Sequence, residues 1–190
     1  MSRSHKIMWA ILGLIGVAVL SFFALWLVVI TSTDPLHTPL GALPLPVACT
    51  THSCVFSSRW RAQTEALDLF ARTSHEPAPS ATQTLTTLVR QHLVSQSLVR
   101  SPVTADDVTR YRSDVLHLTD EQLVREKTGL SLADYDHLVV KPFLEEQALL
   151  QIRHDTSLDQ LFHQLGQEHV VWIFARGLTW DAEMATVVQK

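Results

Sequence analysis

The stretch GLSLADYDHLVVKPFLEEQALLQI, residues 129–152, decides the fold class. Gly129 suits the position just after a helix, and Ser131 is a good N-cap for the helix that follows. After Ser131, apolar residues recur every three or four positions, as on one face of a helix. They are Leu132, Tyr135, Leu138, Val139, Pro142, Phe143, Leu149 and Ile152. We therefore predict a long amphipathic helix that Pro142 kinks or divides, because its ring displaces the preceding turn.

Four further helices are predicted on the N-terminal side of this stretch, so that the fold class is mainly α. Ser57 or Ser58 can cap the first helix, which ends before a Pro-rich loop at residues 74–80. Thr104 and Asp107 resemble a capping box at the start of the third, with Asp in place of the usual Glu or Gln. The four segments are residues 57–73, 81–99, 104–115 and 119–129.

Short strands are predicted at both ends of the helical region. Residues 47–50 and 53–56 read as a tight β-hairpin. Near the C-terminus we expect a short helix at residues 157–165, one further strand at 170–175 and a terminal helix at 181–189. A lone strand needs a partner, and the hairpin can supply one. Such pairing would join the two ends of the domain.

The two cysteines lie on opposite strands of the predicted hairpin. If Thr50 pairs with Ser53 through hydrogen bonds, Cys49 faces Cys54 at the next rung, where Cα atoms are about 4.5 Å apart. That separation is short but within reach of a disulfide. Two free thiols are the second interpretation. A metal site that also uses His52 is the third, although no fourth ligand is evident nearby.

An uncharged apolar run, IMWAILGLIGVAVLSFFALWLVVI, precedes the domain, beginning at Ile7 and ending at Ile30. As a helix its 24 residues would span roughly 36 Å, enough to cross a hydrocarbon core of roughly 30 Å. Arg3 and Lys6 precede it, whereas residues 31–48 contain no Lys or Arg, which places the N-terminus in the cytoplasm. A cleaved signal peptide would have a shorter apolar region. We therefore predict an uncleaved, single-pass membrane anchor.

Everything after the anchor is expected outside the cytoplasm. Residues 1–30 form the cytoplasmic tip and anchor, residues 31–46 a spacer with four prolines, and residues 47–190 one extracytoplasmic domain. The part after the anchor contains 13 Lys and Arg against 19 Asp and Glu, a formal charge of −6. Because no basic stripe is present to neutralise phosphates, the composition argues against nucleic acid as a partner.

The sequence contains none of the common catalytic or nucleotide-binding motifs, so no catalytic residue, metal ligand or cofactor is predicted. The chain lacks H-E-x-x-H, G-x-S-x-G and a P-loop, and has only six glycines. His163 and His169 are interpreted as exposed side chains rather than ligands. Glu145 and Glu146 are adjacent on a helix, point in different directions and do not form a dyad.

Several segments together resemble the N-terminal chaperone region of SurA, PpiD and PrsA-type proteins over residues 45–153. The matching pieces are Leu45-Pro46-Val47-Ala48, Val103-Thr104-Ala105-Asp106-Asp107-Val108, Gly129-Leu130-Ser131 and Val140-Lys141-Pro142-Phe143-Leu144. No single motif is specific, and the order and spacing carry the resemblance. It implies a mainly helical domain of SurA-N type that binds unfolded exported chains.

Two features depart from that family. Its hairpin commonly turns on Asn-Gly, whereas this chain has Thr50-Thr51-His52-Ser53. Relatives often continue into a parvulin prolyl isomerase domain, but only residues 154–190 follow here. Within them, Trp172-Ile173-Phe174-Ala175-Arg176-Gly177 resembles a late parvulin segment, and the opening strand with its His is missing. Residues 154–190 are therefore interpreted as a parvulin remnant without a prolyl isomerase site.

The leading functional hypothesis is a membrane-anchored, extracytoplasmic chaperone or holdase without catalysis, whose partners are unfolded or nascent exported polypeptides. Two alternatives stay open, a divergent parvulin-type prolyl isomerase and a structural subunit of an envelope complex. The aromatic side chains of Trp60, Tyr135 and Phe143 are the candidate client-binding residues if they line a surface groove instead of the core.

Overall fold

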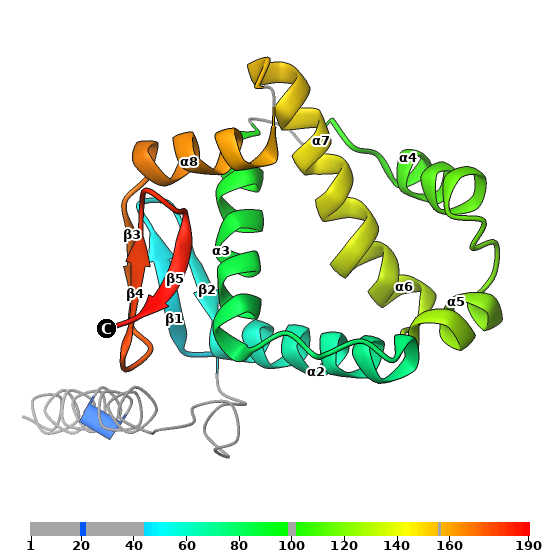
Figure 1. Cartoon of the computed structure of the whole chain (residues 1–190), viewed down its shortest axis with the longest axis horizontal. Helices are drawn as coiled ribbons and strands as arrows, with labels where there is room; N and C mark the ends of the chain where they lie inside the picture. Colours follow the sequence, from blue (N-terminus) through cyan, green and yellow to red (C-terminus); the bar gives the residue numbers. More distant parts are fainter. Residues whose placement is uncertain (1–19, 22–43, 99–101, 156) are drawn as a thin grey trace, which may run out of the picture.

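The computed structural model describes residues 20–21, 44–98, 102–155 and 157–190. From residue 44 onward they form a mainly helical domain with two small sheets (Figure 1). The helical fold class predicted from the sequence is therefore correct. The predicted anchor from Ile7 to Ile30 lies outside the described residues except for Leu20 and Ser21. Within the described ranges, no helix combines the length and the apolar character that crossing a membrane requires.

A three-stranded antiparallel sheet joins the two ends of the domain. It contains β1 (Pro46–Thr50), β2 (Cys54–Phe56) and β3 (Val171–Ile173) in the order β2-β1-β3. The predicted hairpin and its pairing with the strand near the C-terminus are both confirmed. Cys49 lies opposite Cys54, and a disulfide joins the two. The disulfide excludes the other two interpretations, free thiols and a metal site, in this structure.

The C-terminal segment differs from its prediction, because residues 181–189 do not form a helix. They belong to a second antiparallel hairpin of β4 (Leu178–Asp181) and β5 (Thr186–Gln189). Asp181 Oδ1 accepts hydrogen bonds from the backbone N–H groups of Glu183 and Met184, which closes the turn. The backbone N–H of Val187 also donates to Thr86 Oγ1 on a distant helix. The C-terminal region thus has three strands rather than one.

Three helices pack around these strands: α2 (Ser57–Ser74), α3 (Ala81–Ser97) and α8 (Leu158–Glu168). Together with the strands and part of α7, they form the first hydrophobic core. Neither Ser57 nor Ser58 caps α2, because the helix already begins at Ser57 and its N-cap residue is Phe56. Ser57 is instead buried in the first helical turn. Its hydroxyl accepts a hydrogen bond from the backbone N–H of Leu45, which attaches the start of β1 to α2.

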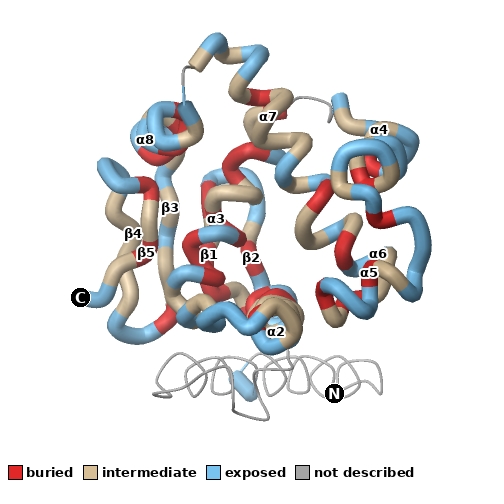
Figure 2. Tube along the Cα trace, turned by 45° about the vertical axis from the view of Figure 1, so that its right-hand side comes forward, coloured by how far each residue is buried: buried red, intermediate tan, exposed pale blue. Residues whose placement is uncertain are grey.

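The remaining helical segments form a second, smaller core beside the first (Figure 2). The capping box of Thr104 and Asp107 is confirmed at the start of this region. Tyr111–Val115 and Asp136–Val140 are π-helical turns, a conformation that is rare in proteins. The segments are α4 (Ala105–Arg110), η2 (Tyr111–Val115), α5 (Glu121–Thr128), α6 (Leu132–Tyr135), η3 (Asp136–Val140) and α7 (Lys141–Arg153).

The long helix predicted after Ser131 is present as the series α6, η3 and α7. Pro142 divides it as expected, because the proline lies at the start of α7 directly after the π-helical turn. In that turn the backbone N–H of Lys141 donates to the carbonyl of Asp136, five residues earlier. The wider π-helical turn accommodates Pro142, which has no backbone N–H group to donate.

Gly129 connects the second core to α2. It ends α5 with a φ of +76°, as the sequence predicts for the residue after a helix. A Cβ at this position would lie 2.8 Å from both Leu69 Cγ and Thr73 Oγ1 of α2. Glycine is therefore needed here for its backbone conformation and for the close approach of the two helices. This contact sets how α2 lies against the second core.

Candidate functional site

The three aromatic residues proposed to bind clients do not form one surface. Trp60 is only 2% exposed and belongs to the first core, where its indole N–H donates to the carbonyl of Ala81. Tyr135 is 8% exposed and belongs to the second core. Phe143 is 38% exposed, and its ring lies 5.4 Å from that of Tyr111. Trp60 is therefore a core residue, whereas Tyr135 belongs to the second core and also lines a cavity described below.

A hollow lies between α2 and the segment from α6 to η3. Most of its lining side chains are small or apolar, and the polar ones are Arg59, Gln63, Glu65, Asp134 and His137. The hollow consists of two adjoining cavities of about 520 and 180 Å³, which we call the apolar groove. Ala62 and Ala66 keep the α2 side open because they carry only a methyl group. The other apolar lining residues are Leu67, Leu69, Phe70, Leu130, Tyr135, Leu138 and Val139.

Gln63 lies between the two cavities of the apolar groove and lines both of them. Its side chain is 2% exposed, and its Oε1 atom has no hydrogen-bond donor within the described part of the chain. A buried acceptor without a donor costs about 1–3 kcal/mol, and native structures contain few of them. Such an acceptor beside an apolar groove would be satisfied by an N–H donor from a bound molecule.

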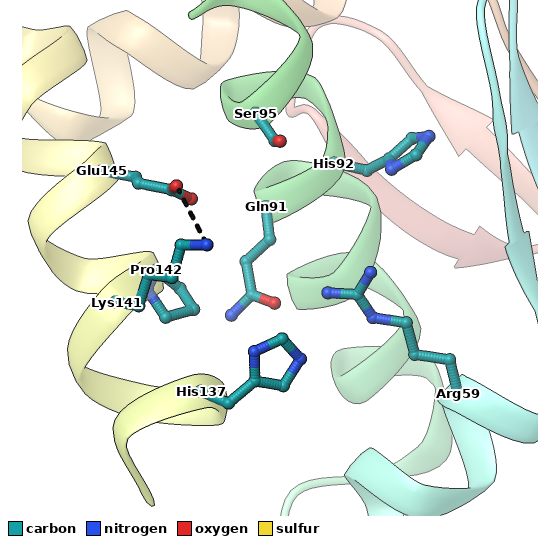
Figure 3. A pocket seen from close by; sticks show the side chains of 8 residues that line it. All are labelled: Arg59, Gln91, His92, Ser95, His137, Lys141, Pro142 and Glu145. Carbon is teal, nitrogen blue, oxygen red and sulfur yellow. Dashed lines mark ion pairs between the residues drawn. The ribbon is translucent and has the colours of Figure 1, made fainter. Parts of the chain in front are cut away.

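A third, polar cavity of about 170 Å³ adjoins the apolar groove, between α3 and the start of α7 (Figure 3). Arg59 and His137 line this polar cavity and the apolar groove, so the two are contiguous. In Figure 3, Arg59 extends from α2 toward the side chains of Gln91 and His137. The other lining residues are His92, Ser95, Lys141, Pro142 and Glu145.

The hairpin turn supports one wall of the polar cavity through His92. The Nε2 atom of His92 lies 2.7 Å from Ser53 Oγ, and Gln96 Nε2 lies 2.6 Å from the same oxygen. Burial lowers the pKa of His92, the hydrogen bond to Ser53 opposes this effect, and the positive charge of Arg59 lowers the pKa further. His92 is therefore a neutral imidazole near neutral pH.

The other titratable residues singled out from the sequence lie in ordinary structural contacts. His163 Nδ1 lies 2.7 Å from the carbonyl oxygen of Glu183, and His169 Nε2 lies 3.4 Å from Ser97 Oγ. Glu145 lies near Lys141, whereas Glu146 is half-buried. Among the described residues, no three His, Cys, Asp or Glu side chains are arranged to hold a metal ion.

Of the aromatic residues selected from the sequence, only Tyr135 lines the apolar groove, and sequence reasoning missed its other lining residues. The available signal was on α2, where Ala62, Ala66 and Leu69 recur at helical spacing on one face. In the structure Leu69 is 44% exposed, so this face is not covered by another element at that point. The polar cavity had no comparable signal, because its residues come from three distant segments of the chain.

Comparison with known proteins gives no assignment: no family model, curated protein or solved structure matches this chain.

Proposed function

We propose that this protein is a membrane-anchored, extracytoplasmic holdase that binds unfolded exported polypeptides in the apolar groove, without catalysis. The observation that carries the proposal is the groove itself, a contiguous hollow of about 520 and 180 Å³ lined mainly by apolar side chains. The resemblance of residues 45–153 to SurA-type chaperone regions supports the same function. The apolar run from Ile7 to Ile30 supports attachment to the membrane.

The size of the groove suits a short apolar segment rather than a folded partner. Burying one Leu, Val or Phe side chain contributes about 1.5–3 kcal/mol. Two or three client side chains in the groove would gain several kcal/mol, part of which is offset by ordering the client. Weak, reversible binding of this kind lowers the concentration of free aggregating chain by mass action.

Gln63 adds a polar contact that any polypeptide can make. Every residue except proline carries a backbone N–H group, so an extended client in the groove can donate to Gln63 Oε1. This contact is independent of the client's side chains. The groove can therefore hold many different sequences, provided that each brings an apolar segment.

The groove predicts the effect of Leu69→Asp on chaperone activity. A carboxylate at this position would have to lose water when a client's apolar side chains enter, so we expect suppression of aggregation to fall at least fivefold. The measurement is light scattering from an unfolded exported protein mixed with the full chain in nanodiscs. Ile152→Asp is the matched control, since Ile152 is 60% exposed on α7 and lies outside the groove. Equal losses for both variants, or no suppression by the unchanged protein, would contradict the proposal.

Gln63→Leu separates binding from folding. Leucine removes a buried acceptor that has no donor, so we expect the free energy of unfolding to rise by about 1 kcal/mol. Client binding should weaken severalfold, because the donor from the client then loses its acceptor. Urea unfolding and aggregation assays measure the two effects on the same protein. A destabilised variant would show that Gln63 serves the fold instead.

A further inference from the structure

We propose that the polar cavity binds the carboxylate side chain of an Asp or Glu within the polypeptide held by the apolar groove. This inference rests on the proposed function, since the groove must first hold a chain. The polar cavity would make the protein prefer clients in which an acidic residue directly follows or precedes an apolar segment.

The two hollows are continuous, which allows one bound chain to reach both. Arg59 on α2 and His137 in η3 line the apolar groove on one side and the polar cavity on the other. A client whose apolar side chains lie between α2 and η3 therefore passes Arg59 and His137 as it leaves the groove. The next side chain along it is in position to enter the polar cavity.

Several hydrogen-bond donors line the polar cavity, of which Arg59, Ser95 and His137 are exposed to solvent and Gln91 is half-buried. Within the described residues, no hydrogen bond or ion pair involves the side chains of Arg59, Gln91, Ser95 or His137. Figure 3 shows these side chains around the cavity, contributed by α2, α3 and η3. Arg59 offers a planar fork of N–H donors that matches the geometry of a carboxylate. Gln91 and Ser95 can donate to the same group.

The charge around the cavity favours an anion. Among the residues that line the polar cavity, Arg59 and Lys141 contribute two positive charges and Glu145 one negative charge. The carboxylates of Glu65 and Asp134 line only the adjoining apolar groove. The Lys141 Nζ to Glu145 Oε1 distance is 4.0 Å, at the outer limit of an ion pair, so Lys141 keeps most of its ability to attract an anion. The cavity is thus positively charged on a domain whose formal charge is negative.

The volume of the cavity fits the end of one side chain. About 170 Å³ is well above the roughly 15 Å³ that a single water needs, and below the roughly 300–1,000 Å³ of sites for small molecules. A carboxylate with its short aliphatic stem fits between these limits. A nucleotide or another cofactor would not.

The test measures peptide binding to the full chain in zwitterionic nanodiscs, with empty nanodiscs as background. The probes are fluorescent peptides with one apolar segment followed by either Glu or Gln, both with an amidated C-terminus. A third peptide carries Gln and a free C-terminal carboxylate. We expect the Glu peptide to bind about fivefold to twentyfold more tightly than the amidated Gln peptide at low salt, with the difference shrinking as salt rises.

Arg59→Gln should abolish this preference, so that the Glu peptide and the amidated Gln peptide bind the variant with equal affinity. Arg61→Gln is the matched control, because Arg61 lies on the same helix, pairs with Glu65 and does not line the cavity. Arg61→Gln should keep the preference. An equal loss in both variants would mean general electrostatic attraction and would overturn the proposal.

The peptide series also separates this inference from the proposed function. Equal binding of the Glu and Gln peptides would overturn the carboxylate site and leave the groove intact. A preference only for the free C-terminus would overturn the side-chain assignment in favour of terminal recognition. Failure of all three peptides to bind would overturn the proposed function itself.

Discussion

Replacing Arg112 with methionine is expected to lower the free energy of unfolding by about 3 kcal/mol. The Arg112 side chain is 6% exposed, and its Nε donates to Asp136 Oδ1 at 2.8 Å. A second N–H group donates to the backbone carbonyl of Leu118. The substitution would leave the carboxylate of Asp136 without its partner at a site where only 22% of that side chain is exposed. Urea unfolding followed by circular dichroism measures the loss.

Two further variants test whether the loss comes from this ion pair. Arg125→Met removes the exposed pair with Glu121 and is expected to cost less than about 0.5 kcal/mol. The double substitution of Arg112 by Met and Asp136 by Leu should recover part of the stability, because no unpaired charge is left behind. A loss below about 1 kcal/mol for Arg112→Met would show that the pair does not hold the two π-helical turns together.

Glu146→Gln is expected to raise stability at pH 8 by about 2–3 kcal/mol and to have little effect at pH 4. Burial raises the pKa of Glu146 to about 7, although the positive charge of Arg90 opposes this shift. The folded protein therefore disfavours the ionised carboxylate. Glutamine has nearly the same shape and carries no charge, so it avoids this cost above neutral pH.

The direction of the pH dependence follows from proton linkage. Between about pH 4.5 and 7 the folded state holds a proton on Glu146 that the unfolded state has released. The contribution of Glu146 to stability is therefore fully present below pH 4.5 and is lost as the pH rises to 7. In Glu146→Gln this fall in the free energy of unfolding between pH 4.5 and 7 should disappear. Glu76→Gln, an exposed position, is the control and should keep it. If both variants kept the same pH dependence of the free energy of unfolding, Glu146 would not be its source.

The local signals in the sequence were sufficient for most element boundaries in the first 150 residues. Thr104 and Asp107 marked the start of a helix through hydrogen bonds between residues three positions apart. Gly129 marked the end of another helix through its left-handed backbone conformation. The register that places Cys49 opposite Cys54 followed from the short turn, because a hairpin sets its own register. The disulfide itself was one of three interpretations that the sequence left open. Ser57 was misjudged as a cap since its partner, Leu45, lies 12 residues away.

The C-terminal region shows where such local signals fail. Residues 181–189 have a spacing that also suits a short helix, yet they form a turn and a strand. The contacts that select the strand are distant, with Thr86 accepting from Val187 N–H and Arg90 Nε donating to the carbonyl of Ala185. Thr86 and Arg90 lie about 100 residues before this segment, so the local sequence around residue 185 does not reveal these contacts.

The sequence by itself determined the helical class, the hairpin with its cysteine pair and the helix break at Pro142, because these depend on neighbours along the chain. The tertiary structure alone decided that Trp60 and Tyr135 are buried and that Gln63 and Arg59 border two contiguous hollows. Burial and cavities depend on how closely helices from distant segments approach. That distance is set by contacts such as the one between Gly129 and α2.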